Sequence, residues 1–306
     1  MKAYVYTGHG GPEVEALTDV PRPEPGPGQL LVAVDAAGVN PADWKRRTGT
    51  MRTPDSPAED FPLLFGREAA GLVAAVGPGV GGFAVGDAVF GSSDGGGFSE
   101  FALLVADITA HRPPGLSATD ASTLPVAGAT AYDGIRQLAL PPGATVLITG
   151  VGGGVGVAAA QIARHQGVTV IGTASAGKKA FVESLGGIHV EYGPGVADRI
   201  RAAAPQGIDG IYDQVGGQAL EEVAPLLADR SKLVSAGDRA IVARLGGAFV
   251  ARARDQATLD TLAQLVISGA LNPYVSHMFT LDQAAEALRL VEEGHVRGKV
   301  VIEVTR

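Results

Sequence analysis

One of several glycine clusters in the chain, Gly150–Gly156, reads GVGGGVG. The apolar stretch Thr145–Thr149 precedes it, and the helical pattern Val155–His165 follows it. A glycine turn between a strand and a helix lets the backbone approach a phosphate closely, and the helix N-terminus attracts its charge. Val151, two residues before Gly153, departs from the G-x-G-x-x-G pattern. The context predicts a dinucleotide site, and the alternative is a tight turn without a ligand.

The residues after the next expected strand, Thr169–Gly172, indicate which dinucleotide this would be. A site for NAD places Asp or Glu at this point, roughly 20 residues beyond the glycines, to bind the ribose 2′-hydroxyl. Here the chain has Ser175, Lys178 and Lys179 instead. A hydroxyl and two ammonium groups suit a 2′-phosphate, which a carboxylate would repel. We therefore predict NADPH, the alternative being two solvated lysines at the start of a surface helix.

Composition excludes several other kinds of chemistry. The 306 residues are enough for about two domains, and the net charge of −8 comes without a basic tract, which argues against nucleic acid. The chain has no cysteine, so disulfides, thiolate catalysis and thiolate-bound zinc are excluded. It has no apolar run of about 18 residues, and its first residues resemble a strand rather than a signal peptide. We expect a cytoplasmic protein with no membrane partner.

The elements needed to position the glycine turn follow a simple order. Short strands separated by turns fill the first third, strands and helices alternate from about Ser117, and a helix and a strand close the chain. We predict an α/β protein in which a β-rich domain, residues 1–120 and 273–306, carries a doubly wound parallel-sheet domain, residues 121–272. Expected strands are 29–37, 69–76, 88–90, 145–149, 169–172, 189–192, 210–213, 233–235 and 299–304. Expected helices are 117–124, 155–165, 178–185, 196–204, 219–227, 255–268 and 281–293.

Eight segments spread along the chain form a recognisable set. They are Gly38–Asp43, Phe65–Gly71, Val85–Phe90, Gly97–Phe101, Leu124–Tyr132, the glycine turn, Tyr212–Gly217 and Gly298–Val301. With these segments in this order, the whole chain resembles the zinc-independent quinone oxidoreductase branch of the medium-chain dehydrogenase/reductase superfamily. The resemblance implies a GroES-like β-barrel domain with an inserted Rossmann domain, NADPH in the cleft between them and a homodimer.

The resemblance also assigns residues to the nucleotide. Together with the lysines above, the predicted cofactor contacts are Asn40, Thr130, Gly152, Gly153, Gly154, Val155, Ser175, Lys178, Lys179, Tyr192, Val215 and Gly237. Tyr192 ends an expected strand, where relatives use a tyrosine beside the 2′-phosphate; ordinary packing is the alternative.

No metal site is expected. Zinc-containing relatives have a His-Glu pair in the segment that here reads Gly66-Arg67-Glu68, so arginine replaces the histidine. The six histidines are scattered without the spacing of metal ligands.

The segment after Asn40 is the candidate for the substrate side. Asn40 precedes a proline and is expected to be extended, with its amide free to point into the cleft. Trp44 could form an apolar wall and Lys45 could donate to a developing oxyanion. Phe249 is a further candidate substrate contact. The alternatives are a core position for Trp44, a solvated Lys45 and burial of Phe249 in the sheet. We name Asn40 and Lys45 as catalytic candidates and no general acid.

The predicted function is hydride transfer from NADPH to quinones or α,β-unsaturated carbonyl compounds, small electrophiles that spread the incoming charge by conjugation. An enoyl-thioester reductase is the nearest alternative. It needs a basic mouth for a phosphopantetheine arm, which only the cluster Lys45, Arg46, Arg47 and Arg52 could provide. A non-catalytic NADPH-binding sensor or structural protein is the alternative from another class.

Overall fold

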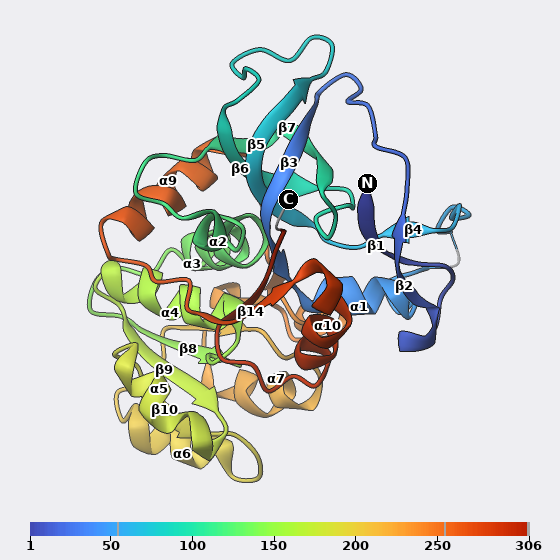
Figure 1. Ribbon diagram of the computed structural model, residues 1–306. Coiled ribbons are helices and arrows are strands. Elements are labelled where there is room, and N and C mark those ends of the chain that lie inside the picture. The colour runs from blue at the N-terminus through green and yellow to red at the C-terminus, as the bar shows by residue number, and fades with distance from the viewer. Residues whose placement is uncertain (54, 254, 305–306) are drawn as a thin grey trace. The chain divides into compact units, whose positions relative to one another are not determined.

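The computed structural model describes residues 1–53, 55–253 and 255–304, and it separates the chain into two compact units (Figure 1). The first unit comprises residues 1–126, 255–267 and 275–304, and the second comprises residues 127–253 and 268–274. The expected boundaries at 120/121 and 272/273 lie close to this division. The difference is the helix at 256–267, which we expected in the nucleotide-binding domain and which belongs to the first unit.

The first unit is a β-barrel with attached helices. Its main sheet has the order β14-β15-β3-β5-β6-β7, and an added pairing of β3 with β7 closes four of these strands into a ring. A smaller antiparallel sheet has the order β2-β1-β4. The strands are β1 Lys2–Tyr6, β2 Glu15–Asp19, β3 Gln29–Val39, β4 Leu63–Leu64, β5 Glu68–Val76, β6 Ala88–Ser93, β7 Phe101–His111, β14 Val275–Thr280 and β15 Lys299–Glu303. The helices are α1 Pro41–Arg47, α2 Ala118–Ala121, α9 Gln256–Ile267 and α10 Ala284–Glu292.

One apolar core fills this unit. Alternate residues of β3, such as Leu30, Val32 and Val34, lie in it, because successive strand residues face opposite sides of a sheet. Helix α10 contributes Ala284 and Leu288, which pack with the inward residues of β15. Burying its apolar stripe against a sheet stabilises this nine-residue helix, since so short a helix is marginal alone.

The second unit is a doubly wound domain. Its six-stranded parallel sheet has the order β10-β9-β8-β11-β12-β13, which is the 3-2-1-4-5-6 order of dinucleotide-binding folds. The strands are β8 Thr145–Thr149, β9 Thr169–Ala174, β10 Ile188–Glu191, β11 Gly210–Asp213, β12 Leu233–Ser235 and β13 Ala248–Phe249. The helices are α3 Ala129–Leu138, α4 Gly154–His165, α5 Lys179–Ser184, α6 Val196–Ala203, α7 Gly217–Val223 and α8 Arg239–Arg244.

Both faces of this sheet are covered, as a parallel sheet requires. Helices α6, α7 and α8 bury apolar residues on one face, including Ile200, Leu220 and Val242, against Leu147 and Ile211. Helices α3, α4 and α5 contact the sheet strands as well, and Val157 of α4 packs with Phe181 of α5. The order of the strands reverses between β8 and β11, which makes their carboxyl ends the place where this fold binds a ligand.

Candidate nucleotide-binding and substrate sites

The glycine turn of the second unit joins β8 to α4, and its glycines serve different purposes. Gly150 has a φ of +64°, a left-handed conformation that side chains disfavour. A Cβ on Gly156 would lie 2.5 Å from the carbonyl oxygen of Gly150, so only glycine lets the helix pack this closely. A Cβ on Gly153 would meet nothing nearer than 3.6 Å, which leaves open backbone at the start of a 12-residue helix. These features fit a bound pyrophosphate.

This geometry accounts for the departure at Val151. The turn glycine is Gly150, three residues before Gly153 rather than two, and Gly153 N–H donates to the Gly150 carbonyl at 3.1 Å. Val151 is fully buried, and a Cβ on Gly172 of β9 would lie 2.5 Å from its side chain. The spacing is therefore G-x-x-G-x-x-G, with Val151 packing the turn onto the sheet.

A buried carboxylate fixes the loops at the point where the strand order reverses. Asp213, at the end of β11, accepts hydrogen bonds from the hydroxyls of Thr149 and Ser235, both at 2.6 Å. It also accepts from the backbone N–H groups of Val215 and Gly216, at 3.0–3.1 Å. Sequence reasoning quoted Asp213 only as part of a motif and missed this role. The signal was available, since Thr149, Asp213 and Ser235 all end expected parallel strands.

Val215 and Gly237 lie in the loops whose backbone N–H groups bind to Asp213 and Ser235. Val215 is 55% exposed at the carboxyl end of β11. A Cβ on Gly237 would lie within 3.0 Å of the backbone of Val215 and Gly216, so the loops after β11 and β12 touch through their main chains. The structure thus brings both residues to the same sheet edge as the glycine turn.

The residues expected at the 2′-phosphate also gather at this edge. Ser175 follows β9 and Tyr192 follows β10, its parallel neighbour, and Tyr192 N–H donates to the Ala174 carbonyl at 3.2 Å. The Tyr192 side chain is 60% exposed. A Cβ on Gly152 would lie 2.7 Å from Lys178 Cδ and 3.3 Å from its Nζ, so this lysine lies against the glycine turn.

The two lysines differ in a way the sequence did not predict. Lys179 begins α5, is exposed, and forms an ion pair with Glu183 one turn later. Lys178 rather than Lys179 is therefore the ammonium beside the turn.

Two further candidates occupy other places in the second unit. Thr130 lies in α3 and is 3% exposed, and its carbonyl accepts the Tyr212 hydroxyl at 2.5 Å. Phe249 ends β13, and the Arg239 guanidinium lies 4.2 Å from its ring centroid. Its carbonyl accepts from Gln137 Nε2 at 3.3 Å.

The Asn40 side chain of the first unit differs from the expectation. Its amide nitrogen donates to Glu68 Oε1 at 2.7 Å and to the Gly38 carbonyl at 3.3 Å. Its amide oxygen accepts from Lys299 Nζ at 2.6 Å. The expectation of a free amide is wrong, because a buried ion pair of Lys299 and Glu68, 3.0 Å apart, uses that amide to complete its hydrogen bonds. Glu68 also accepts the Val126 N–H, at 2.7 Å.

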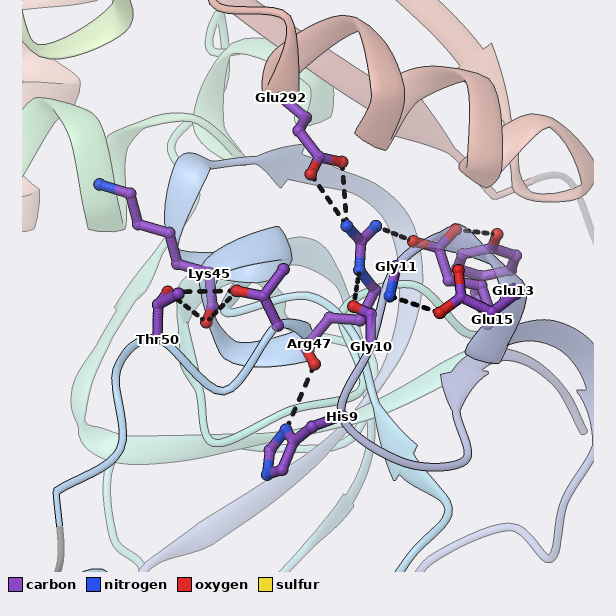
Figure 2. Close-up of polar contacts among 11 residues, drawn as sticks. His9, Gly10, Gly11, Glu13, Glu15, Lys45, Arg47, Thr50 and Glu292 are labelled. Atoms are coloured by element: carbon purple, nitrogen blue, oxygen red, sulfur yellow. Dashed lines mark hydrogen bonds and ion pairs between the residues drawn. The ribbon is translucent and has the colours of Figure 1, made fainter.

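Trp44 and Lys45 lie side by side on α1. Trp44 is half-buried, and the Lys45 ammonium lies 5.6 Å from its ring centroid. Figure 2 shows the Lys45 side chain extending away from the polar contacts around Arg47, while its carbonyl accepts the hydroxyls of Thr48 and Thr50.

Only part of the basic cluster proposed for a phosphopantetheine arm is available at the surface. Arg47 is 1% exposed, and Figure 2 shows its guanidinium between Glu15, Glu292 and the Gly10 carbonyl. Its bonds to the two Glu292 oxygens are both 3.0 Å. Arg52 is paired with Glu59 at 2.7 Å. Two of the four basic groups are thus neutralised locally, which weakens the case for a thioester arm.

The first unit also contains a cavity of about 380 Å³. Its apolar wall comes from Pro62, Leu63, Leu64 and Phe65, and its polar lining includes Asp43, Arg46, Glu59 and Arg67. Asp43 is 2% exposed and accepts the Asn40 N–H at 2.8 Å, which caps α1. Burial raises the pKa of Asp43 to about 7, although Asn40 N–H and the Lys299 charge oppose the shift.

Arg67 stands where zinc-containing relatives have histidine. Its guanidinium donates to the Asp94 carbonyl at 2.8 Å. Within residues 1–53, 55–253 and 255–304, no three His, Cys, Asp or Glu side chains lie close enough together to hold a metal ion. Over the same ranges, no helix has the length and apolar character needed to span a membrane.

Comparisons with known proteins cover the whole chain. Two family models match it, described as an alcohol dehydrogenase GroES-like domain at residues 26–114 and a zinc-binding dehydrogenase at residues 190–302. The chain is 32% identical to a 2-methylene-furan-3-one reductase of Solanum lycopersicum over 99% of its own length and 79% of the relative's.

Solved structures agree with this similarity. A quinone oxidoreductase from Coxiella burnetii matches with a TM-score of 0.92 and 30% identity, covering 100% of this chain and 99% of that one. A mycobacterial protein complexed with NADPH matches with a TM-score of 0.87 and 29% identity, covering 99% of this chain and 100% of that one.

Proposed function

Because the chain belongs to the quinone oxidoreductase branch of the medium-chain dehydrogenase/reductase superfamily, we propose that it is an NADPH-dependent reductase of quinones or α,β-unsaturated carbonyl compounds. The observation that carries the cofactor choice is the pair Ser175 and Lys178 at the carboxyl end of β9, where an NAD site would have an acid. A similar mycobacterial protein that binds NADPH supports the same cofactor, and the quinone oxidoreductase and furanone reductase among the relatives support the substrate class.

The second unit holds the nucleotide through its own residues. The open backbone at Gly153 and the N-terminus of α4 attract the pyrophosphate, and the Asp213 cluster keeps the next loops in place. Ser175 and Lys178 bind the 2′-phosphate, with Tyr192 beside it. When bound, the reduced nicotinamide supplies a hydride to an electrophilic carbon.

The first unit supplies the substrate side. The Lys299–Glu68 pair locks Asn40, which keeps the start of α1 in place. This makes Asn40 a positioning residue. Trp44 and Lys45 on that helix remain the candidates for contact with the electrophile, as does Phe249 in the second unit.

The resemblance also supports a homodimer and a cytoplasmic location. Size-exclusion chromatography with light scattering tests the dimer, which should have about twice the 31.0 kDa mass of the chain. A monodisperse species at the mass of one chain would contradict it.

Steady-state oxidation of NADPH and NADH tests the proposed function. The electrophiles are 9,10-phenanthrenequinone, a 2-alkenal and crotonyl-CoA, each added alone. We expect turnover with NADPH and faster reduction of the quinone or the alkenal than of the thioester, because Arg47 and Arg52 are already paired. Preference for crotonyl-CoA would favour the enoyl-thioester reductase. Tight NADPH binding without any turnover would favour the sensor or structural role.

A further inference from the structure

Asp43 has more than the capping of α1 requires. Its carboxyl group is buried, it lines the 380 Å³ cavity, and among the residues that the structure describes it receives one hydrogen bond, from Asn40 N–H. Capping α1 requires only one of the two carboxyl oxygens. The second oxygen is left for a group inside the cavity.

The cavity next to Asp43 is lined by groups that suit a small electrophile. Apolar residues from Pro62 to Phe65 form one wall. Arg46 follows Asp43 by three residues, on the same side of α1, and also lines the cavity. Arg67 lines the cavity as well. Two guanidinium groups and a carboxyl group that line one cavity favour an oxygen atom that gains negative charge during the reaction.

The ionisable groups that line the same cavity as Asp43 or act on its charge come from several elements. They are Arg46 on the same helix, Tyr6 of β1, Glu59, Arg67, Glu68 of β5, Asp94 and Lys299 of β15. Lys299 and Arg67 lower the pKa of Asp43 and Glu68 raises it, but burial is the largest effect and brings the pKa to about 7. A carboxyl group that titrates near neutral pH can both give up a proton and regain one.

We propose that Asp43 is the proton donor of the reductase, an inference that rests on the proposed function. Addition of hydride leaves the substrate as an enolate or a quinolate, with the negative charge on oxygen. The O–H bond of Asp43 breaks, its proton bonds to that oxygen, and the electron pair remains on the Asp43 carboxylate. Arg46 and Arg67, which line the same cavity, stabilise this carboxylate until it takes up a proton from solvent.

Asp43→Asn tests this with the cap preserved, because the amide oxygen can still accept Asn40 N–H while the amide cannot donate an acidic proton. Asp43→Glu is the matched variant that keeps an acid, and glutamate is common at this position of a helix. Both are compared with the wild-type protein in kcat/KM for the 2-alkenal across pH, and in carboxyl ¹³C NMR of the cofactor-free protein.

In the cofactor-free wild-type protein, we expect a carboxyl resonance that titrates near pH 7 and is missing from Asp43→Asn. We expect kcat/KM to fall tenfold per pH unit above about 7, since the acid form is the active one. Asp43→Asn should be about 10²–10⁴-fold slower without this dependence, and Asp43→Glu should restore it. The 2′-phosphate of NADPH also titrates, with a pKa of about 6, but this titration is the same for all three proteins.

Three results would overturn the role of Asp43. They are an Asp43 resonance that titrates near its ordinary value of about 3.9, an Asp43→Asn rate equal to wild type, or an Asp43→Asn profile that keeps the fall above pH 7. These leave the reductase itself intact. Absence of turnover in the wild-type protein with NADPH bound would instead overturn the proposed function, and the proton-donor role with it.

Discussion

The two units build their polar centres in opposite ways. At the nucleotide edge of the second unit, Gly150, Ser175 and Val215 each follow a short parallel strand, so position along the sequence places them at one sheet edge. In the first unit, Asn40 meets Lys299 across 259 positions, and Arg47 meets Glu292 across 245. A site made by strand ends can be found from local patterns, whereas a buried charge network depends on the closure of the barrel.

The largest expected effect comes from breaking the network of the first unit. Lys299→Met leaves Glu68 buried without its cation, and we expect a loss of about 3–5 kcal/mol in the free energy of unfolding. Lys2→Met is the matched control, because the Lys2–Asp19 pair is exposed and screened by solvent, so its loss should leave the free energy of unfolding almost unchanged. Urea denaturation of both variants measures the difference. Equal losses would mean that burial does not distinguish the two pairs.

The next largest effect is a pH dependence of the free energy of unfolding, caused by the Asp43 carboxyl group. Its folded-state pKa, raised by burial to about 7, lies above the unfolded value of about 3.9, so the folded protein binds more protons between these pH values. Stability relative to Asp43→Asn should therefore fall as pH rises, by up to about 1.4 kcal/mol per unit, or about 2–3 kcal/mol from pH 5 to 7. Urea midpoints of both proteins at pH 5, 6, 7 and 8 measure it, and parallel curves would contradict the shift.

Substitutions in the glycine turn of the second unit should have a smaller effect on stability. They distinguish a glycine that packing requires from a glycine that lets the phosphate approach the backbone. Gly156→Ala places a Cβ against the turn backbone and should lower the free energy of unfolding by about 1–3 kcal/mol. Gly153→Ala has room for its Cβ and should change it by less than about 0.5 kcal/mol. Thermal unfolding and NADPH titration of both variants distinguish the two roles. Gly153→Ala should weaken nucleotide binding while leaving stability unchanged, and wild-type affinity in that variant would contradict the phosphate approach.

Sequence patterns predicted the second unit well. The strands Thr145–Thr149 and Gly210–Asp213 lie where expected, because short apolar runs between turns are typical of buried parallel strands. In the first unit, β7 was missed, although Ala102 and Leu104 face the core and Leu103 between them does not, which is the alternation of a strand. The strand Val275–Thr280 was missed too, since its residues are mostly polar or exposed.

The candidate site residues could also be predicted only in part. The stretch from Ser175 to Lys179 predicts a phosphate site, but which of its lysines lies against the glycine turn depends on how η3, Ala176–Lys178, begins the next helix. The expected helix from 117 to 124 is correctly capped by Ser117, whose hydroxyl accepts Asp120 N–H at 2.9 Å, yet it ends at Ala121. The occupied amide of Asn40 required knowledge of Glu68 and Lys299, which no spacing along the chain provides.

The edge formed by β9 and β10 should select NADPH through Lys178, whose side chain lies against the glycine turn. Dissociation constants of NADPH and NADH for wild type, Lys178→Ala and the control Lys179→Ala test this selection. Lys178→Ala should weaken NADPH about 5–150-fold, which corresponds to about 1–3 kcal/mol, and should change NADH little. Lys179→Ala, whose ammonium is paired with Glu183, should change both less. An equal loss of affinity for NADPH and NADH in Lys178→Ala would mean that Lys178 does not bind the 2′-phosphate.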